Sequence, residues 1–154
     1  MKWTAKDIEI YIKEKAFIDT VMIPLLPVSF DEDIKESALQ LEFIALLSTL
    51  IEKQFAGRVL LSPPFTYLQA DAIEAVASFL EKWTKSIRDN GTTHLFYLTS
   101  DNSWKLIEHQ LEGTLLWMPA LLIDQLSDSQ KWSIAENQVN QLVDFFVKKW
   151  REKE

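Results

Sequence analysis

The segment from Thr20 to Ser29, TVMIPLLPVS, has apolar, β-branched or proline residues at nine of its ten positions. Polar and apolar residues do not alternate in it, which is typical of a strand buried on both faces between layers of helices. We predict a strand from about residue 17 to residue 26. Pro24 and Pro27 should mark its C-terminal end, because proline donates no hydrogen bond to a sheet ladder.

Five segments carry apolar residues at the spacing of an amphipathic helix. The capping patterns that mark three of their N-termini are Thr4 with Asp7, Ser29 with Glu32, and Ser127 with Gln130. A fourth, shorter helix is capped by Ser100, Asp101 or Ser103. The expected helices span approximately residues 4–15, 29–56, 70–90, 101–112 and 127–150.

Three further short strands are expected at residues 58–61, 93–99 and 114–118. Helices and strands then alternate along the chain, which predicts parallel strands joined by right-handed crossovers. We predict one α/β domain over residues 1–154, a three-layer α/β/α sandwich around a small, mainly parallel four-stranded sheet with Rossmann-like or flavodoxin-like topology. Residues 120–126 are apolar and fit a helical turn.

The glycines and prolines separate the two edges of this sheet. Gly57, Gly91 and Gly113 each follow a helix and precede a strand, where a left-handed helix cap is expected. The five prolines follow strands, at the edge where parallel sheets bind ligands. That edge contains no glycine, although phosphate-binding loops and dinucleotide fingerprints need one there. The common modes of nucleotide binding are therefore not expected.

The composition excludes several classes of function. The net charge is −7 and the 16 Lys and Arg residues are scattered, whereas a nucleic-acid-binding protein needs a basic face. The sequence contains no cysteine, which removes disulfides and thiolate nucleophiles and fits a reducing compartment. The first residues lack a signal-peptide pattern and no apolar run is long enough to span a bilayer, so we expect a cytoplasmic protein without membrane insertion.

Few residues could carry catalysis or bind a metal. Ser62 is followed by two prolines and does not belong to a Gly-x-Ser-x-Gly nucleophile elbow. The chain has two histidines, and neither belongs to a metal-binding spacing. We predict no catalytic residue, no cofactor and no metal. One alternative is a hard-cation site formed by Asp31, Asp101 and Asp124.

A cleft at the C-terminal ends of the strands is the candidate ligand site. The side chains that could line it are Ser62, Tyr67, Ser100, Asp101, Asn102 and Trp117. The group around Asp101 also fits plain capping, because Ser, Asp and Asn are preferred where a strand passes into a helix. Most of the six tryptophans should lie in the core, but Trp117 ends a strand and could line an apolar pocket or contact a partner.

Six phrases of the sequence are distinctive: IDT at 18–20, IPLLPVSF at 23–30, IEKQF at 51–55, FTY at 65–67, HLFYLT at 94–99 and LLW at 115–117. On the basis of these phrases, the chain resembles the YpiF-like family over nearly its whole length. This family consists of small uncharacterised proteins from Bacillus-type Firmicutes and is classed as a domain of unknown function. The resemblance implies a bacterial, cytoplasmic protein. It brings no catalytic residues.

The sequence favours an uncharacterised protein that acts as a non-enzymatic binding, accessory or regulatory module, with a protein partner or a small polar ligand. This hypothesis predicts an exposed apolar patch near Trp117 and Pro119. The alternative is a small-molecule binder or enzyme that uses the cleft at the C-terminal ends of the strands. It requires the polar side chains around Asp101 to line an open cleft.

Overall fold

The computed structural model describes residues 1–121 and 124–152. The helices are α1 (Ala5–Lys13), α2 (Ile34–Gln54), α3 (Ile73–Asp89), the 3₁₀ helix η1 (Asn102–Gln110) and α4 (Asp128–Glu152); the strands are β1 (Thr20–Val28), β2 (Val59–Leu61), β3 (Phe65–Leu68), β4 (His94–Thr99) and β5 (Thr114–Trp117). The turn predicted at 120–126 includes residues 122–123, which lie outside the described residues.

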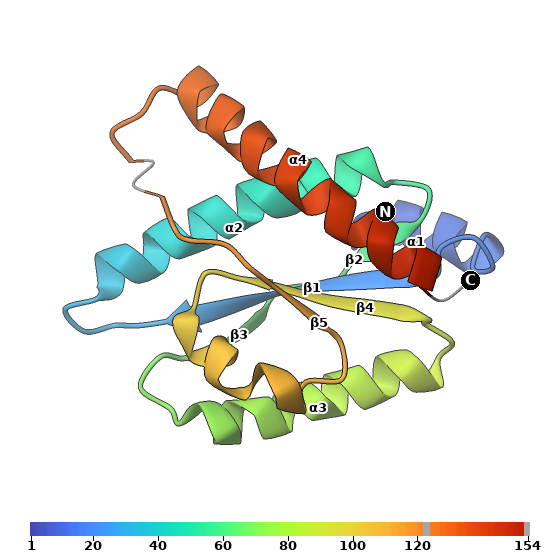
Figure 1. Cartoon of the computed structure of the whole chain (residues 1–154), viewed down its shortest axis with the longest axis horizontal. Helices are drawn as coiled ribbons and strands as arrows, with labels where there is room; N and C mark the ends of the chain where they lie inside the picture. The colour runs from blue at the N-terminus through green and yellow to red at the C-terminus, as the bar shows by residue number, and fades with distance from the viewer. Residues whose placement is uncertain (122–123, 153–154) are drawn as a thin grey trace.

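All strand pairs of the sheet are parallel, which confirms the predicted α/β fold. β1 lies in the centre and pairs with β4, which pairs with β5 (Figure 1). β2 and β3 follow each other along the other side of β1, opposite residues 20–22 and 25–28. The sheet has five strands instead of four, because Phe65–Leu68 forms a strand where only the approach to a helix was expected.

The prediction that Pro24 and Pro27 end β1 is wrong, since both lie inside the strand. Neighbouring residues of a parallel strand direct their backbone groups to opposite sides. Ser62 N donates to Met22 O, so the backbone groups of Met22 face the side of β2. Pro24, two residues further on, faces the same side, at the interruption between β2 and β3. Pro27 faces the β4 side, beyond the last pair with β4 at Pro24 and Leu98. Neither position needs a backbone donor, so the strand tolerates both prolines.

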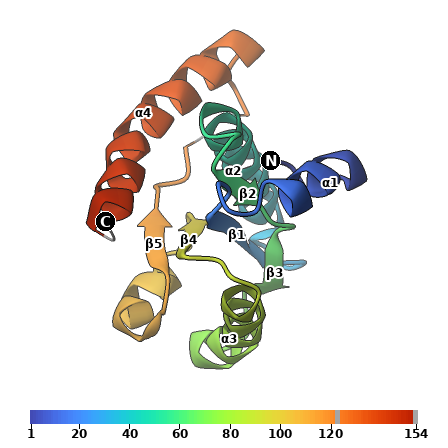
Figure 2. The same ribbon diagram turned by 90° about the vertical axis from the view of Figure 1, so that its right-hand side faces the viewer.

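Helices cover the sheet on two sides (Figures 1 and 2). α2 and α4 pack on one face, in a core that includes Phe43 and Phe146, and α3 and η1 pack on the other, in a core that includes Leu80 and Trp104. Met22 and Ile23 of β1 enter opposite cores, which explains why that strand shows no polar alternation. Figure 2 shows α1 outside both layers, beside β2, and none of its residues is buried.

The capping pattern at the start of α4 is confirmed. Ser127 N donates to Gln130 Oε1 at 2.9 Å and Gln130 N donates to Ser127 Oγ at 3.2 Å. Thr4 likewise caps α1 by accepting from Asp7 N. Both patterns act within one helical turn, so the sequence alone is enough to identify them.

The prediction that Ser29 and Glu32 cap α2 is wrong, because that helix begins at Ile34. Ser29 N donates instead to Ser37 Oγ, which donates in turn to Pro27 O. The buried Ser37 hydroxyl thus joins the first turn of α2 to the end of β1. Contacts over eight and ten positions are outside the range of capping rules.

Only one of the three predicted glycine caps is confirmed. Gly91 has a φ of 99°, in the left-handed region that glycine reaches without steric cost. Gly57 and Gly113 do not have positive φ, so their predicted left-handed conformation is wrong. Glycine is required at position 113 for a different reason, the closeness of a neighbouring strand.

Candidate functional site

Tyr67 and Asp101, two of the predicted site residues, contact each other at the C-terminal edge of the sheet. The Tyr67 hydroxyl, on β3, donates to Asp101 Oδ2 at 2.5 Å and accepts from Trp104 Nε1 at 2.8 Å. The rings of Tyr67 and Trp104 meet edge to face. Asp101 Oδ1 accepts from Ser103 N and caps η1, as the capping interpretation predicted. The group therefore joins β3 to η1.

The surroundings of Tyr67 keep its hydroxyl protonated. Burial raises the pKa of Tyr67 far above its ordinary value, and the negative charge of Asp101 raises it further. A tyrosine with such a pKa does not supply the phenolate that a general base or nucleophile needs. The geometry of the pair is thus explained by packing and capping.

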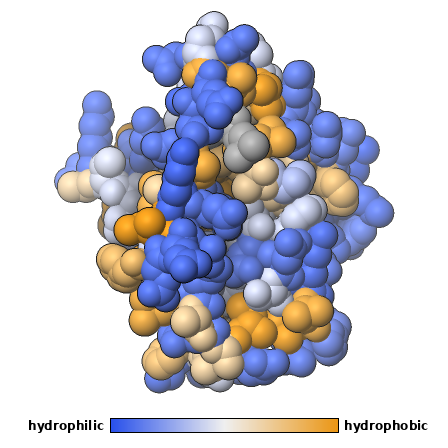
Figure 3. All heavy atoms as spheres, turned by 90° about the vertical axis from the view of Figure 1, so that its left-hand side faces the viewer, coloured by the Kyte–Doolittle hydropathy of each residue, from blue (hydrophilic) through white to orange (hydrophobic). Residues whose placement is uncertain are grey.

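The other residues predicted at this edge do not line one open cleft with them. Ser100 is buried and Asn102 is exposed on η1. Lys105 covers the ring of Trp117, with Nζ 3.3 Å from the ring centroid, and Met118 is buried. The face at the C-terminal ends of the strands is mostly hydrophilic, with its apolar side chains in separate groups (Figure 3). The apolar surface that the binding hypothesis requires lies elsewhere.

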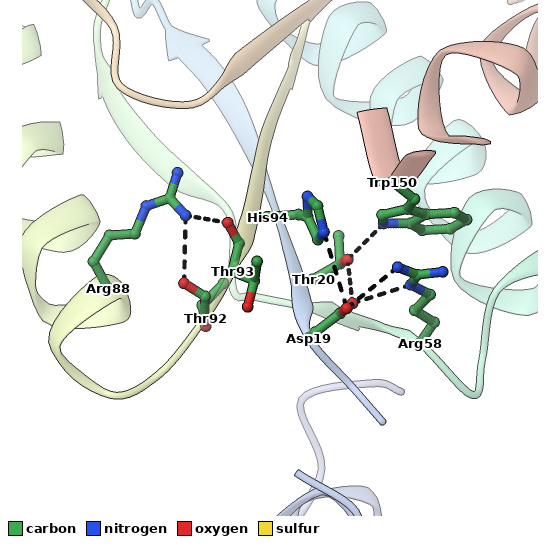
Figure 4. Close-up of polar contacts among 8 residues, drawn as sticks. All are labelled: Asp19, Thr20, Arg58, Arg88, Thr92, Thr93, His94 and Trp150. Carbon is green, nitrogen blue, oxygen red and sulfur yellow. Dashed lines mark hydrogen bonds and ion pairs between the residues drawn. The ribbon is translucent and has the colours of Figure 1, made fainter. Parts of the chain in front are cut away.

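A polar network occupies the opposite edge, at the N-terminal ends of the strands (Figure 4). The Asp19 carboxylate accepts from Arg58 Nε at 3.1 Å and Nη2 at 3.3 Å. His94 Nε2 lies 3.9 Å from the same carboxylate. Thr20 Oγ1 donates to Asp19 Oδ1 at 2.9 Å and accepts from Trp150 Nε1 at 2.8 Å. The network therefore joins α4 to the starts of β1 and β4.

Two further contacts stabilise the end of α4 and the start of β4. The Arg58 guanidinium lies over the ring of the buried Trp150, with Cζ 4.1 Å from the centroid. Arg88 donates to Thr92 O and Thr93 O and so closes the turn that leads into β4 (Figure 4). The contact of Arg58 with Trp150 joins distant segments and that of Arg88 closes a local turn, and neither indicates a reaction.

An apolar cleft lies between α1 and α3, beside β2. It encloses about 550 Å³, within the range of about 300–1,000 Å³ of small-molecule sites. Its walls include Trp3, Ile8 and Ile12 around α1, Leu60 of β2, and Trp83 and Ile87 of α3. Ser62, predicted at the other edge of the sheet, lines this cleft instead.

Large apolar side chains are exposed at this cleft. The exposed fractions are 58% for Trp3, 67% for Ile12 and 37% for Trp83. The prediction that most tryptophans are core residues is wrong for Trp3, Trp83 and Trp132. The rings of Trp83 and Phe65 meet edge to face at a centroid distance of 5.3 Å, and Trp83 also lines the cleft. Core packing therefore does not account for the apolar character of this surface.

The charge of the cleft comes from two lysines. Within the described residues, Lys15 and Lys82 are the charged side chains of its lining, and neither takes part in an ion pair. The stem of Lys15 lies beside Gly91, and Lys82 Nζ lies 5.5 Å from the ring centroid of Phe79. The Ser62 hydroxyl donates to Pro63 O, and the described residues of the lining include no histidine or carboxylate that could act as a base.

Sequence reasoning missed Trp3, Ile12 and Lys15, although the sequence contains a signal for them. The segment IEIYI at 8–12 covers more of a helix surface with apolar residues than one core-facing stripe requires. Phe79 and Trp83, four residues apart on α3, widen its apolar face in the same way. A helix with more apolar surface than its contact with the core can bury is expected to make a second apolar contact.

Residues 1–121 and 124–152 contain neither a cluster of metal-binding side chains nor a helix that could span a membrane. No three His, Asp or Glu side chains of these residues gather where they could hold a metal ion, so Asp31, Asp101 and Asp124 do not form the alternative cation site. No helix of the same residues is long and apolar enough to cross a membrane.

Comparison with known proteins gives a family without an assigned activity. Residues 9–150 match the family described as "Protein of unknown function (DUF2487)". The chain is 31% identical over 153 residues to the "Uncharacterized protein YpiF" of Bacillus subtilis (strain 168), which covers 97% of this chain and 98% of that protein. No solved structure matches the chain.

Proposed function

The chain belongs to this family of proteins of unknown function, and we propose that it acts as a non-enzymatic binding module for an amphiphile, a molecule with an apolar body and an anionic group. The cleft between α1 and α3 is the proposed site. The observation that carries the proposal is an open apolar cleft whose charged lining residues, in the described part of the chain, are two lysines without a carboxylate partner.

The apolar walls account for the body of the ligand. Burying about 100 Å² of apolar surface in a cleft contributes roughly 2.5 kcal/mol, and Trp3, Ile12 and Trp83 expose such surface around it. We expect the body of the ligand to be a flat aromatic group or a single alkyl chain, which such apolar walls would bury. Small-molecule sites are typically apolar with few polar groups, as this cleft is.

The two lysines of the cleft account for the anionic group of the proposed ligand. The chain carries a net charge of −7, so an anion is repelled by most of its surface. Lys15 and Lys82 place two cations at the cleft, where a carboxylate, sulfonate or phosphate group would pair with them. The proposal includes no reaction, because Ser62 has no base among those lining residues that the structure describes.

Two predictions from composition accompany this proposal. The absence of cysteine is compatible with work in the reducing cytoplasm. The acidic balance argues against a nucleic-acid partner. A small polar ligand at the C-terminal edge is less well supported, because Tyr67 and Asp101 already bond to each other there.

The test measures the binding of three probes that share a dodecyl chain: dodecanoate, dodecanol and dodecyltrimethylammonium. Titration is followed by calorimetry and by tryptophan fluorescence, to which Trp3 and Trp83 contribute. We expect dodecanoate to bind most tightly. Lys15→Gln with Lys82→Gln should weaken dodecanoate by about tenfold or more and leave dodecanol almost unchanged.

A matched pair of variants locates the site. Ile12→Glu puts a carboxylate at the cleft, and Phe145→Glu makes the same change at an exposed apolar residue of α4. We expect dodecanoate binding to be lost in Ile12→Glu and kept in Phe145→Glu. Equal losses in both variants, or no binding to the unmodified protein, would overturn the proposal.

A further inference from the structure

β3 is an edge strand with one side open in the described part of the chain. Gln69 N donates to Val28 O, so the backbone groups of positions 65, 67 and 69 face β1. The alternating positions, Thr66 and Leu68, therefore direct their N–H groups away from the sheet. No described residue accepts a hydrogen bond from either N–H.

The same edge is closed along β2. There the outward backbone groups belong to Val59 and Leu61, and Met1 pairs with both. Leu61 N donates to Met1 O at 2.9 Å, and the Met1 ammonium donates to Val59 O at 2.8 Å. One half of the edge thus shows how an added segment binds it. In the other half, the N–H and C=O of Thr66 and the N–H of Leu68 have no partner among the described residues, while Leu68 O accepts from Asp71 N at 3.0 Å.

An apolar groove of about 390 Å³ runs beside the open half. Phe65, Tyr67, Phe79 and Trp83 line it, and 61% of the Phe79 surface is exposed. Leu68, on β3 itself, is 50% exposed. Soluble proteins commonly protect edge strands with lysine or proline. The sequence of β3, FTYL, contains neither.

The charge around this groove is positive at Phe79, where Lys82 Nζ lies 5.5 Å from the ring centroid, and negative towards Asp71 and the end of β3. Asp71 is the charged residue among its described lining. Gln69 Nε2 donates to Asp33 Oδ2 at 3.5 Å, so the acidic segment Asp31-Glu32-Asp33 adjoins the end of β3, outside the described lining of the groove. A partner with positive charge is attracted both by these groups and by the net charge of −7.

We propose that the edge of β3 binds an extended segment of a partner protein, which adds to the sheet as a strand. Its backbone pairs with the N–H and C=O of Thr66 and with the N–H of Leu68. An apolar side chain enters the groove at Phe79, and a Lys or Arg lies beside Asp71. Such strand addition combines main-chain hydrogen bonds with side-chain pockets. A second copy of the chain is a poorer occupant, because it brings another net charge of −7 to an acidic edge.

The probe is a phage-displayed library of random decapeptides, selected on the whole protein. We expect selected peptides to combine β-branched or aromatic residues with Lys or Arg. Thr66→Pro removes the outward N–H without touching the β1 ladder and should weaken a selected peptide by about tenfold or more. Thr66→Ala keeps the N–H and should bind as the unmodified protein does.

A second measurement covers the case in which Thr66→Pro fails to fold. N-methylation of successive amides in a selected peptide, tested on the unmodified protein, should abolish binding at alternate positions only, because alternate residues of a strand face the partner. Hydrogen exchange should slow at Thr66 and Leu68 when the peptide binds and stay the same at Leu61, which already donates to Met1.

Three outcomes would overturn the proposal: no enriched peptide, peptides that bind Thr66→Pro unchanged, or acidic selected sequences. Dimerisation in sedimentation that Thr66→Pro abolishes would assign the edge to a second copy and overturn the partner proposed here. The dodecanoate experiment uses Ile12 and the two lysines of the cleft, so either proposal can fail alone.

Discussion

Gly113 shows how one residue is decided by its neighbour in space. A Cβ at this position would lie 2.8 Å from Leu95 O and 2.8 Å from Tyr97 Cε2, and both atoms belong to β4. These distances are shorter than carbon–oxygen and carbon–carbon contacts allow. Only glycine therefore lets the chain enter β5 this close to β4.

Gly113→Ala should lower the free energy of unfolding by about 1–3 kcal/mol, because β4 cannot move away without breaking its pairing with β1. Gly57→Ala is the matched control, since a Cβ there meets no atom within 4 Å. Its effect should stay within about 1 kcal/mol and be neutral or stabilising. Urea unfolding of both variants tests this, and equal stability of the two would contradict it.

At the scale of elements, α4 depends on contacts far from it in the sequence. Its residue Trp150 lies 130 positions from Thr20, to which its indole donates a hydrogen bond. The cation of Arg58 adds an interaction on the ring face. The helix begins with a local capping box, so its two ends are stabilised in different ways.

Trp150→Phe should lower the free energy of unfolding by roughly 1–3 kcal/mol, because it removes a buried hydrogen bond and part of the ring under Arg58. Trp132→Phe, at an exposed indole of the same helix, should change it by less than about 0.5 kcal/mol. Chemical unfolding measures both. Thr20→Val should lower the free energy of unfolding by about 1 kcal/mol less in the Trp150→Phe variant than in the unmodified protein, because the hydrogen bond between the two residues is already absent there. Full additivity would show that the two residues are not coupled.

Among elements, β3 was the one that sequence patterns did not predict. Its sequence, FTYL, is short and lies between two prolines and a helix, so its apolar residues also fit the approach to α3. Pairing with residues 25–28 of β1 decides its conformation. The same long-range pairing brings Tyr67 to Asp101, a contact between residues 34 positions apart.

At the scale of the whole molecule, two buried tyrosines link stability to alkaline pH. Burial raises the pKa of Tyr67 and of Tyr97 above the ordinary value, and in Tyr97 the hydrogen bond with Thr84 partly offsets this. In the unfolded chain tyrosine ionises near about pH 10. Above that pH the unfolded state loses protons that the folded state keeps, so the free energy of unfolding falls as pH rises.

We expect this fall to reach roughly 1.4 kcal/mol per pH unit for each such tyrosine. Tyr67→Phe removes one of the two ionisations, so its stability should fall less steeply between about pH 10 and about pH 11 than that of the unmodified protein. Urea unfolding across this range provides the comparison. Identical slopes would show that Tyr67 has an ordinary pKa in the folded protein.

The sequence by itself determined the parallel α/β fold, because apolar periodicity and capping patterns act within a few residues. The doubly buried β1 and the caps at Thr4 and Ser127 were predicted from such patterns. It also gave Asp101 as one of three candidate caps of η1, with Ser100 and Ser103, and the structure has Asp101 in that role. It did not locate the cleft, since its walls come from α1, β2 and α3 and form only where these meet.

Tertiary structure decided the features that depend on which segments become neighbours. Pro24 and Pro27 are tolerated inside β1 because the adjacent strands leave gaps at the required places. Phe65–Leu68 became a strand because β1 offered an unpaired side. Trp3 and Trp83 remain exposed because α1 packs on the edge of the sheet and not on a face. Such outcomes follow from packing between distant residues, which no local pattern encodes.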